Sequence, residues 1–207
     1  MIELLTGSIL LSIIHAVIPN HWIPLVMIGR AEKWSRKELI SVTALTSFAH
    51  TLSTILLGIA IGLVGYRLSN SYHINTDVVA PLVLVLMGLI YFSISLKHGN
   101  HEHMPPQEKL RNKSKKAMII TLALSMFFSP CLEIEAYYFN AGTHGWWAIG
   151  LLSVVYLLVT VAGSILLVSL ASKSIEKFKW HFLEHHEKKI TGMVLIALGL
   201  LSYFFKH

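Results

Sequence analysis

The chain has 207 residues, of which 54% are hydrophobic and 14% are charged, and its formal net charge is +6. Soluble domains carry roughly 25% charged residues to cover a hydrated surface, so this composition excludes an ordinary water-soluble domain. We expect the basic residues to set membrane topology and to contact anionic lipid, and we expect no nucleic-acid partner.

Six apolar stretches are long enough to cross a bilayer, because a spanning helix needs about 20 mostly apolar residues. Lipid tolerates no unpaired backbone groups and no alternating barrel pattern is present, so these stretches are predicted to be helices. In chain order the spans are Leu4–Ile28, Leu39–Tyr66, Val78–Leu96, Ala117–Phe139, Trp146–Ala171 and Ile190–Phe205. The predicted fold class is therefore all-α, a polytopic membrane protein with six transmembrane helices.

The first span is not expected to be a cleaved signal, since it opens with Glu3 and no small-residue cleavage site follows. Basic residues alternate between the loops: those after the first, third and fifth spans hold four, six and five, whereas the second holds only Arg67 and the fourth none. The positive-inside rule then places both termini outside, in a protein integral to the cell (inner) membrane.

Three spans per half give the two halves opposite orientations, which predicts a 3+3 inverted repeat. The repeats are residues 1–97 and 117–207, and a His-rich cytoplasmic loop at 98–116 joins them. Pro19 and Pro130 lie at corresponding places in the first and fourth spans. Since proline removes a backbone donor and clashes with the preceding turn, both helices are predicted to break there and to face each other at a binding site. Two ordinary proline kinks are the alternative.

Three histidines lie within the first two spans, namely His15, His21 and His50. Polar groups in hydrocarbon are costly and usually face the bundle interior or a water-filled path. Imidazole is a preferred ligand of nickel, cobalt, zinc and copper, so these three residues are predicted to be metal ligands. His50 also lies on a polar stripe at helical spacing, for which helix–helix hydrogen bonding is the alternative.

The second half contributes Glu133, which we expect to supply negative charge to the metal site; an interfacial carboxylate is the alternative. A wider group is expected around the site or in gating: Asn20, Ser47, Thr51, Ser53, Thr54, Cys131, Glu135, Tyr137 and Asn140. Short His-rich tracts can bind metal, so the loop residues His98, His101 and His103 form a second candidate, with a plain solvated loop as the alternative.

Two motifs resemble the nickel/cobalt transporter family and its efflux-type relatives, which belong to an exporter superfamily with 3+3 inverted repeats. They are His15-Ala-Val-Ile-Pro-Asn20-His21 and Ala49-His50-Thr51. The resemblance implies His15, His21 and His50 as ligands. The chain departs from the uptake-type pattern at Asn20, where that family has aspartate, and at Ala49, where it has glycine. The break at Pro130-Cys131 is similar to Pro-Cys breaks of the wider superfamily, but with a single cysteine a disulfide relay is not expected.

These features predict a secondary transporter of a nickel- or cobalt-like cation, with the histidine loop favouring export. The sequence has no nucleotide-binding loop, so no nucleotide cofactor is expected. We expect transport to be coupled to protons or to another ion instead. The substrate or bound ion is a divalent transition metal (nickel, cobalt or zinc), and a homo-oligomer is compatible with the sequence. Two alternatives stay open: a membrane-embedded metalloenzyme with a His/Glu site, and a transporter of a small organic solute or anion.

Overall fold

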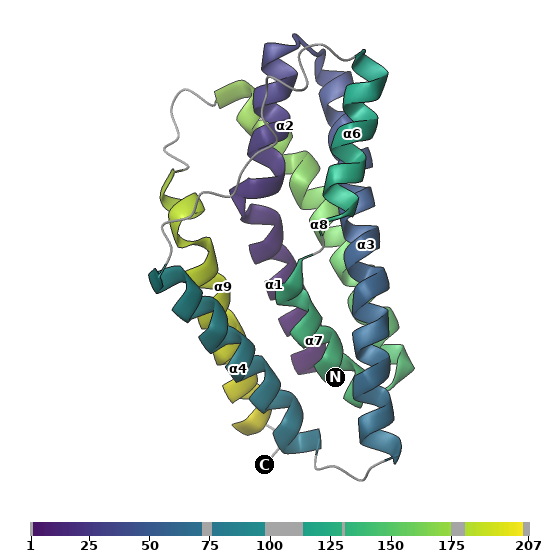
Figure 1. Cartoon of the computed structure of the whole chain (residues 1–207), viewed down its shortest axis with the longest axis vertical. Helices are drawn as coiled ribbons and strands as arrows, with labels where there is room; N and C mark the ends of the chain where they lie inside the picture. Colours follow the sequence, from purple (N-terminus) through teal and green to yellow (C-terminus); the bar gives the residue numbers. More distant parts are fainter. Residues whose placement is uncertain (1, 72–75, 98–113, 130, 175–180, 205–207) are drawn as a thin grey trace.

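The structure is a computed structural model that describes residues 2–71, 76–97, 114–129, 131–174 and 181–204. Every regular element within these ranges is an α-helix, which confirms the predicted all-α class. In chain order the helices are α1 (Ile2–Val17), α2 (Pro19–Ala31), α3 (Arg36–Ser71), α4 (Thr76–Lys97), α6 (Lys115–Phe127), α7 (Leu132–Thr143), α8 (Trp146–Ser174) and α9 (His181–Phe204) (Figure 1).

Three described segments are long and apolar enough to cross a membrane, where the sequence predicted six. They are Leu4–Ala31, Arg36–Asn70 and Trp146–Ser172, and shorter apolar stretches occupy Val78–Ile90 and Gly192–Leu201. Large apolar side chains face outward along the long helices, with Leu158 63% and Leu166 59% exposed. Such a surface is compatible with a membrane protein, because lipid tails cover apolar side chains that water would not.

The first predicted span consists of two helices. Helix α1 ends at Val17, Ile18 has φ −58° and ψ 126°, and α2 begins at Pro19. Proline at the first helical position loses no hydrogen bond, since that amide has no partner within the helix, so it suits the start of α2. The Trp22 indole donates to the carbonyl of Val17 at 3.3 Å and so satisfies one acceptor at the end of α1.

The fourth predicted span is also two helices, because α6 ends at Phe127 and α7 begins at Leu132. Pro130, which was predicted to break this span, lies outside the described residues. Helices of 13 and 12 residues are each too short to cross a bilayer alone, which needs about 20. Neither helix is among the described segments that are long and apolar enough to cross a membrane.

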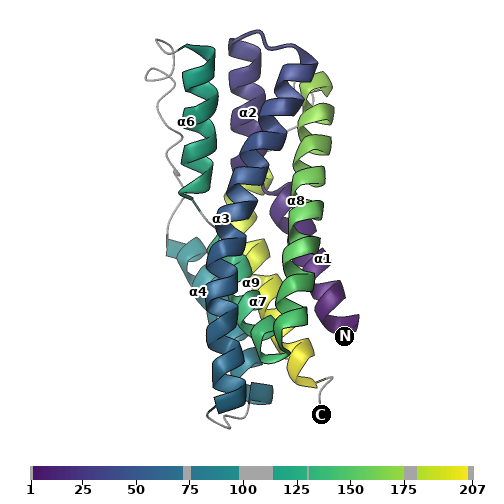
Figure 2. The same cartoon turned by 90° about the vertical axis from the view of Figure 1, so that its right-hand side faces the viewer.

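Helices α3 and α8 run the full length of the bundle, and the other helices lie beside one half of it (Figures 1 and 2). At one end, here called the basic end, α2 ends, α3 and α6 begin, and α8 ends. Arg30 donates to the carbonyl of Ser172, Arg36 donates to Ser169 Oγ at 2.7 Å, and Lys115 pairs with Glu38. Helices α1, α4, α7 and α9 surround the opposite half.

Glycines bring helices into close contact in this opposite half. A Cβ added to Gly142 of α7 would lie 2.0 Å from the carbonyl oxygen of Gly62 on α3. A Cβ on Gly192 of α9 would lie 2.7 Å from the carbonyl oxygen of Gly88 on α4. No side chain larger than hydrogen fits at such approaches, so α3 with α7 and α4 with α9 form tightly packed pairs.

Candidate metal site

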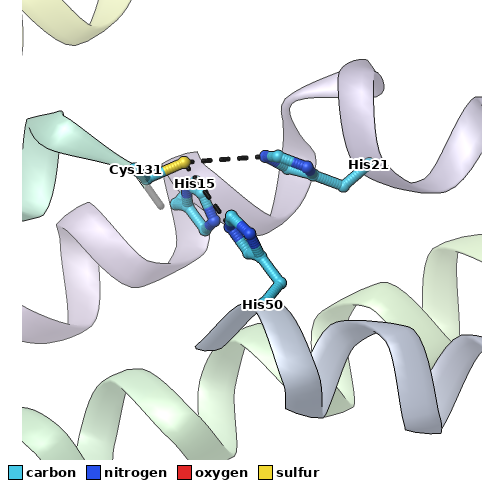
Figure 3. A group of neighbouring side chains, drawn as sticks. All are labelled: His15, His21, His50 and Cys131. Atoms are coloured by element: carbon cyan, nitrogen blue, oxygen red, sulfur yellow. Dashed lines mark hydrogen bonds between the residues drawn. The ribbon is translucent and has the colours of Figure 1, made fainter. Parts of the chain in front are cut away.

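Four potential metal ligands meet in the middle of the bundle, between the two helix breaks (Figure 3). His15 lies in the last turn of α1, His21 in the first turn of α2, His50 midway along α3, and Cys131 at the N-cap of α7. Residues six apart on a continuous helix would point about 120° apart around its axis. The break at Ile18 therefore allows His15 and His21 to face one point.

The four ligand atoms, one from each residue, all lie within 4.8 Å of one another. Cys131 Sγ is 3.5 Å from His50 Nε2 and 3.7 Å from His21 Nε2. In tetrahedral coordination, metal–nitrogen bonds of about 2.0 Å and metal–sulfur bonds of about 2.3 Å place neighbouring ligand atoms roughly 3.3 to 3.6 Å apart. The sulfur–nitrogen distances are therefore close to those of a bound first-row transition metal.

Hydrogen bonds around the group orient two of its members. His50 Nδ1 lies 3.2 Å from the carbonyl oxygen of Met126, which can only accept, so this nitrogen is the donor. His50 Nε2 then presents its lone pair to Cys131, as metal-ligating histidines do when a carbonyl fixes their tautomer. The Cys131 amide donates to Thr54 Oγ1 at 3.3 Å, and Thr54 Oγ1 donates to the His50 carbonyl at 3.1 Å. Thr54 thus connects α3 to the start of α7.

His15 and His50 are buried, with 6% and 2% of their surfaces exposed, whereas His21 and Cys131 are partly buried. His15 Nε2 has no hydrogen-bond partner among the described residues, although it is enclosed. Leaving a buried polar atom without a partner costs about 1 to 3 kcal/mol, so such an atom needs an explanation. An ion bound among the four residues would supply a partner for this nitrogen.

Two small cavities adjoin the site, each with about 10 Å³ accessible to a water-sized sphere, which is room for about one water molecule. The cavity on the side of the basic end is lined by His15, His21, Leu25, Thr46, Ser47, His50, Met126, Thr160 and Ser164. The cavity on the opposite side is lined by Leu11, Ile14, His15, Ile18, Glu133, Ile134 and Val194. His15 belongs to both.

The predicted histidine ligands thus come together, but the second half contributes differently from the prediction. Cys131 was expected near the site and joins the ligand group itself, whereas Glu133 is not a member of that group. Glu133 instead lines the second cavity with His15. The sequence signal for Cys131 was its place directly after the Pro130 break, where the chain leaves one helix for the next.

The predicted polar residues of α3 support the site from their own helix. Ser53 Oγ donates to the His50 carbonyl at 2.8 Å, and Thr51 donates to the carbonyl of Ser47. Ser47 also lines the cavity on the side of the basic end. The polar stripe is therefore hydrogen-bonded within α3, while part of it faces the site.

Three predicted residues of α7 line neither cavity. Tyr137 donates to the carbonyl of Leu4 at 3.2 Å, and the Asn140 carbonyl lies 3.0 Å from His144 Nδ1. Glu135 is 4% exposed, and neither of its carboxylate oxygens has a hydrogen-bond partner among the described residues. The Asn20 side chain and the loop residues His98, His101 and His103 lie outside what the structure describes.

Helix α8 contributes residues that the sequence analysis did not name. Tyr156 packs against the site, with its ring centroid 5.4 Å from that of His15, and Thr160 and Ser164 line the cavity near the basic end. Their spacing of four residues places them on one helical face, which is the signal that could have identified them. Comparison with protein-family models, with curated proteins and with solved structures gives no match.

Proposed function

We propose that this protein is a secondary transporter of a divalent transition-metal cation, of the nickel, cobalt and zinc group, and that His15, His21, His50 and Cys131 bind the ion as substrate. The observation that carries the proposal is the convergence of four ligand atoms within 4.8 Å inside an apolar helical bundle. Sequence resemblance to nickel/cobalt transporters points to the same ion class.

The donor set selects the class of ion. Three imidazoles and one thiol suit zinc, cobalt, nickel and copper, whereas magnesium and calcium prefer carboxylate and carbonyl oxygens. A thiolate at Cys131 would offset one of the ion's two charges, and its place at the N-cap of α7 favours negative charge through the helix dipole. The ends of α1 and α6, where carbonyls accumulate partial negative charge, approach the same region.

The helix contacts support an inverted repeat of six spans. The broken pair α1 and α2 packs against α8 of the other half, and the broken pair α6 and α7 packs against α3. Helix α3 also contacts α8, and α4 contacts α9, each being the equivalent helix of the other half. Exchanging the two halves turns the contact of α1 with α8 into that of α6 with α3, and this correspondence is expected for transporters built from inverted repeats.

The depth of the site supports a transport pathway. His50 follows Arg36 by 14 residues, which is about 21 Å of helix rise. A bilayer about 40 to 45 Å thick, with Arg36 at its surface, places His50 near the midplane, where transporters of this architecture bind their substrates. We propose that the basic end is cytoplasmic and that both termini lie outside the cell membrane.

Contacts between the two halves occur at both ends of the bundle. At the basic end the Arg30, Arg36 and Lys115 interactions join the first half to the second. At the other end Tyr137 donates to Leu4 and Ser69 Oγ donates to the carbonyl of Thr143, again between halves. Rocking of one half against the other would open one set of contacts while keeping the other, which is alternating access.

Metal uptake or efflux by cells expressing His50→Ala at the wild-type level tests this proposal. We expect transport of nickel, cobalt or zinc to fall at least tenfold, because His50 supplies one of the four ligand atoms. His144→Ala is a matched control, since His144 caps α7 far along the helix from Cys131 and belongs to neither cavity. Unchanged transport by His50→Ala, or an equal loss in both variants, would refute the assignment.

A further inference from the structure

We infer that a second, transient metal site exists beside the first, formed by His15 and Glu133 in the cavity away from the basic end. The ion would occupy it on the way between the four-ligand group and that end of the bundle. This inference rests on the proposed function and adds to it the path that the ion follows.

His15 is the residue that connects the two positions. It belongs to the four-ligand group and lines both cavities, so its ring forms part of the wall between them. Its Nε2 is enclosed and has no hydrogen-bond partner among the described residues. An ion moving between the cavities could therefore keep this ligand throughout, exchanging only the others.

The start of α7 provides one anionic ligand to each position. Cys131 is the N-cap of α7 and Glu133 lies in its first turn, two residues later. Two residues correspond to about 200° around a helix, so the two side chains leave the helix in nearly opposite directions. Cys131 accordingly joins the histidines, and Glu133 lines the other cavity.

The ion and its ligands would carry the same net charge at the two positions. A divalent ion held by three neutral imidazoles and a thiolate carries a net charge of +1, and so does the same ion held by His15 and the Glu133 carboxylate. An ion with no anionic ligand would be far more costly in a bilayer interior. Stabilisation of the α7 dipole alone would also favour a carboxylate in the first turn, but it would not require that carboxylate to share a cavity with His15.

Affinity measurements on the purified full-length protein in detergent test the inference, with Co²⁺ as the probe. Four proteins are compared: wild type, Glu133→Gln, Cys131→Ala and the double variant. In wild type the ion occupies the four-ligand group, so we expect Glu133→Gln to weaken binding less than threefold. In the Cys131→Ala background the ion relies on Glu133 for its anionic ligand, so we expect the same substitution to weaken binding at least tenfold.

Two outcomes overturn the inference. If Glu133→Gln lowers Co²⁺ affinity equally in both backgrounds, Glu133 belongs to one site together with the four ligands. If it lowers the affinity in neither background, Glu133 does not bind the ion. Glu135→Gln is the matched control. It removes a carboxylate from the same helix, at a residue that lines neither cavity. We expect this control to leave Co²⁺ affinity unchanged in both backgrounds.

Transport by Glu133→Gln supplies a readout that does not depend on folding of the double variant. We expect its maximal transport rate to fall at least tenfold while its Co²⁺ affinity and the thiolate-to-cobalt absorption band are kept. A rate equal to that of wild type would overturn the inference. If wild type neither binds nor transports the ion, the proposed function is refuted. If wild type does both and Glu133→Gln transports at the same rate, only the transient site is refuted.

Discussion

Replacing Cys131 with serine tests the ligand group most directly. Serine keeps a side chain of similar size and hydrogen-bonding capacity but removes the sulfur that lies 3.5 Å from His50 Nε2 and 3.7 Å from His21 Nε2. It also removes the only group in the set that carries negative charge when it binds metal. A change confined to this atom therefore separates metal ligation from packing.

The size of the effect follows from the number of ligands. Four-ligand zinc sites bind with roughly 10 to 16 kcal/mol, so an equal share for each ligand is about 2.5 to 4 kcal/mol. Since 1.4 kcal/mol corresponds to a factor of ten, Cys131→Ser is expected to weaken Zn²⁺ or Co²⁺ binding about 100- to 1,000-fold. Each of the four residues already supplies one of the ligand atoms, which lie within 4.8 Å of one another. None of the other three can therefore take the place of the Cys131 sulfur.

Competitive titration against a chelator measures the affinity, and thermal unfolding gives an independent check. A ligand at 100 times its dissociation constant stabilises a protein by about 2.7 kcal/mol. With binding 100-fold weaker, the same metal concentration stabilises Cys131→Ser by only about 0.4 kcal/mol. If the affinity of Cys131→Ser lies within tenfold of wild type, Cys131 is not a ligand, and the site consists of histidines alone.

Two further predictions concern the packing of α7 and α8. Gly142→Ala is expected to destabilise the protein by about 1 to 3 kcal/mol, because its Cβ would lie 2.0 Å from the carbonyl oxygen of Gly62. Gly150→Ala is the control, since a Cβ added there would have no neighbour within 4 Å. This control should unfold at or above the wild-type temperature. Glu135→Leu is expected to raise the free energy of unfolding by about 1 to 3 kcal/mol. Both carboxylate oxygens of Glu135 are buried without a hydrogen-bond partner among the described residues. Equilibrium denaturation measures the change, and a loss of stability would contradict the prediction.

The sequence predicted the helical class and singled out three of the four residues that form the His/Cys group, because both depend on local signals. Apolar length indicates helices, and a histidine within such a stretch is costly unless it faces the interior. The meeting of His15 with His21 followed from the position of Pro19 between them. The structure ends α1 at Val17 and begins α2 at Pro19, next to the predicted position.

The roles of Cys131 and Glu133 could not be predicted in the same way. The sequence predicted that Glu133 supplies charge to the metal site, but a new helix begins at Leu132, just before this residue, after α6 ends at Phe127. Which of two neighbouring side chains faces the histidines depends on how this second helix is rotated by its packing against α3. Such rotation is set by tertiary contacts, including Tyr138 against Gly58, that leave no pattern in a single sequence.

The division of ligands between the two halves gives the proposed transport a physical basis. All three imidazoles come from the first half, on α1, α2 and α3, and the thiol comes from the second half, on α7. Movement of one half against the other would change the distance from Cys131 Sγ to His21 and His50 while leaving the histidines together. Because a conformation that separates the thiolate from the imidazoles must bind the ion more weakly, the approach of Cys131 to His21 and His50 would couple ion affinity to conformation.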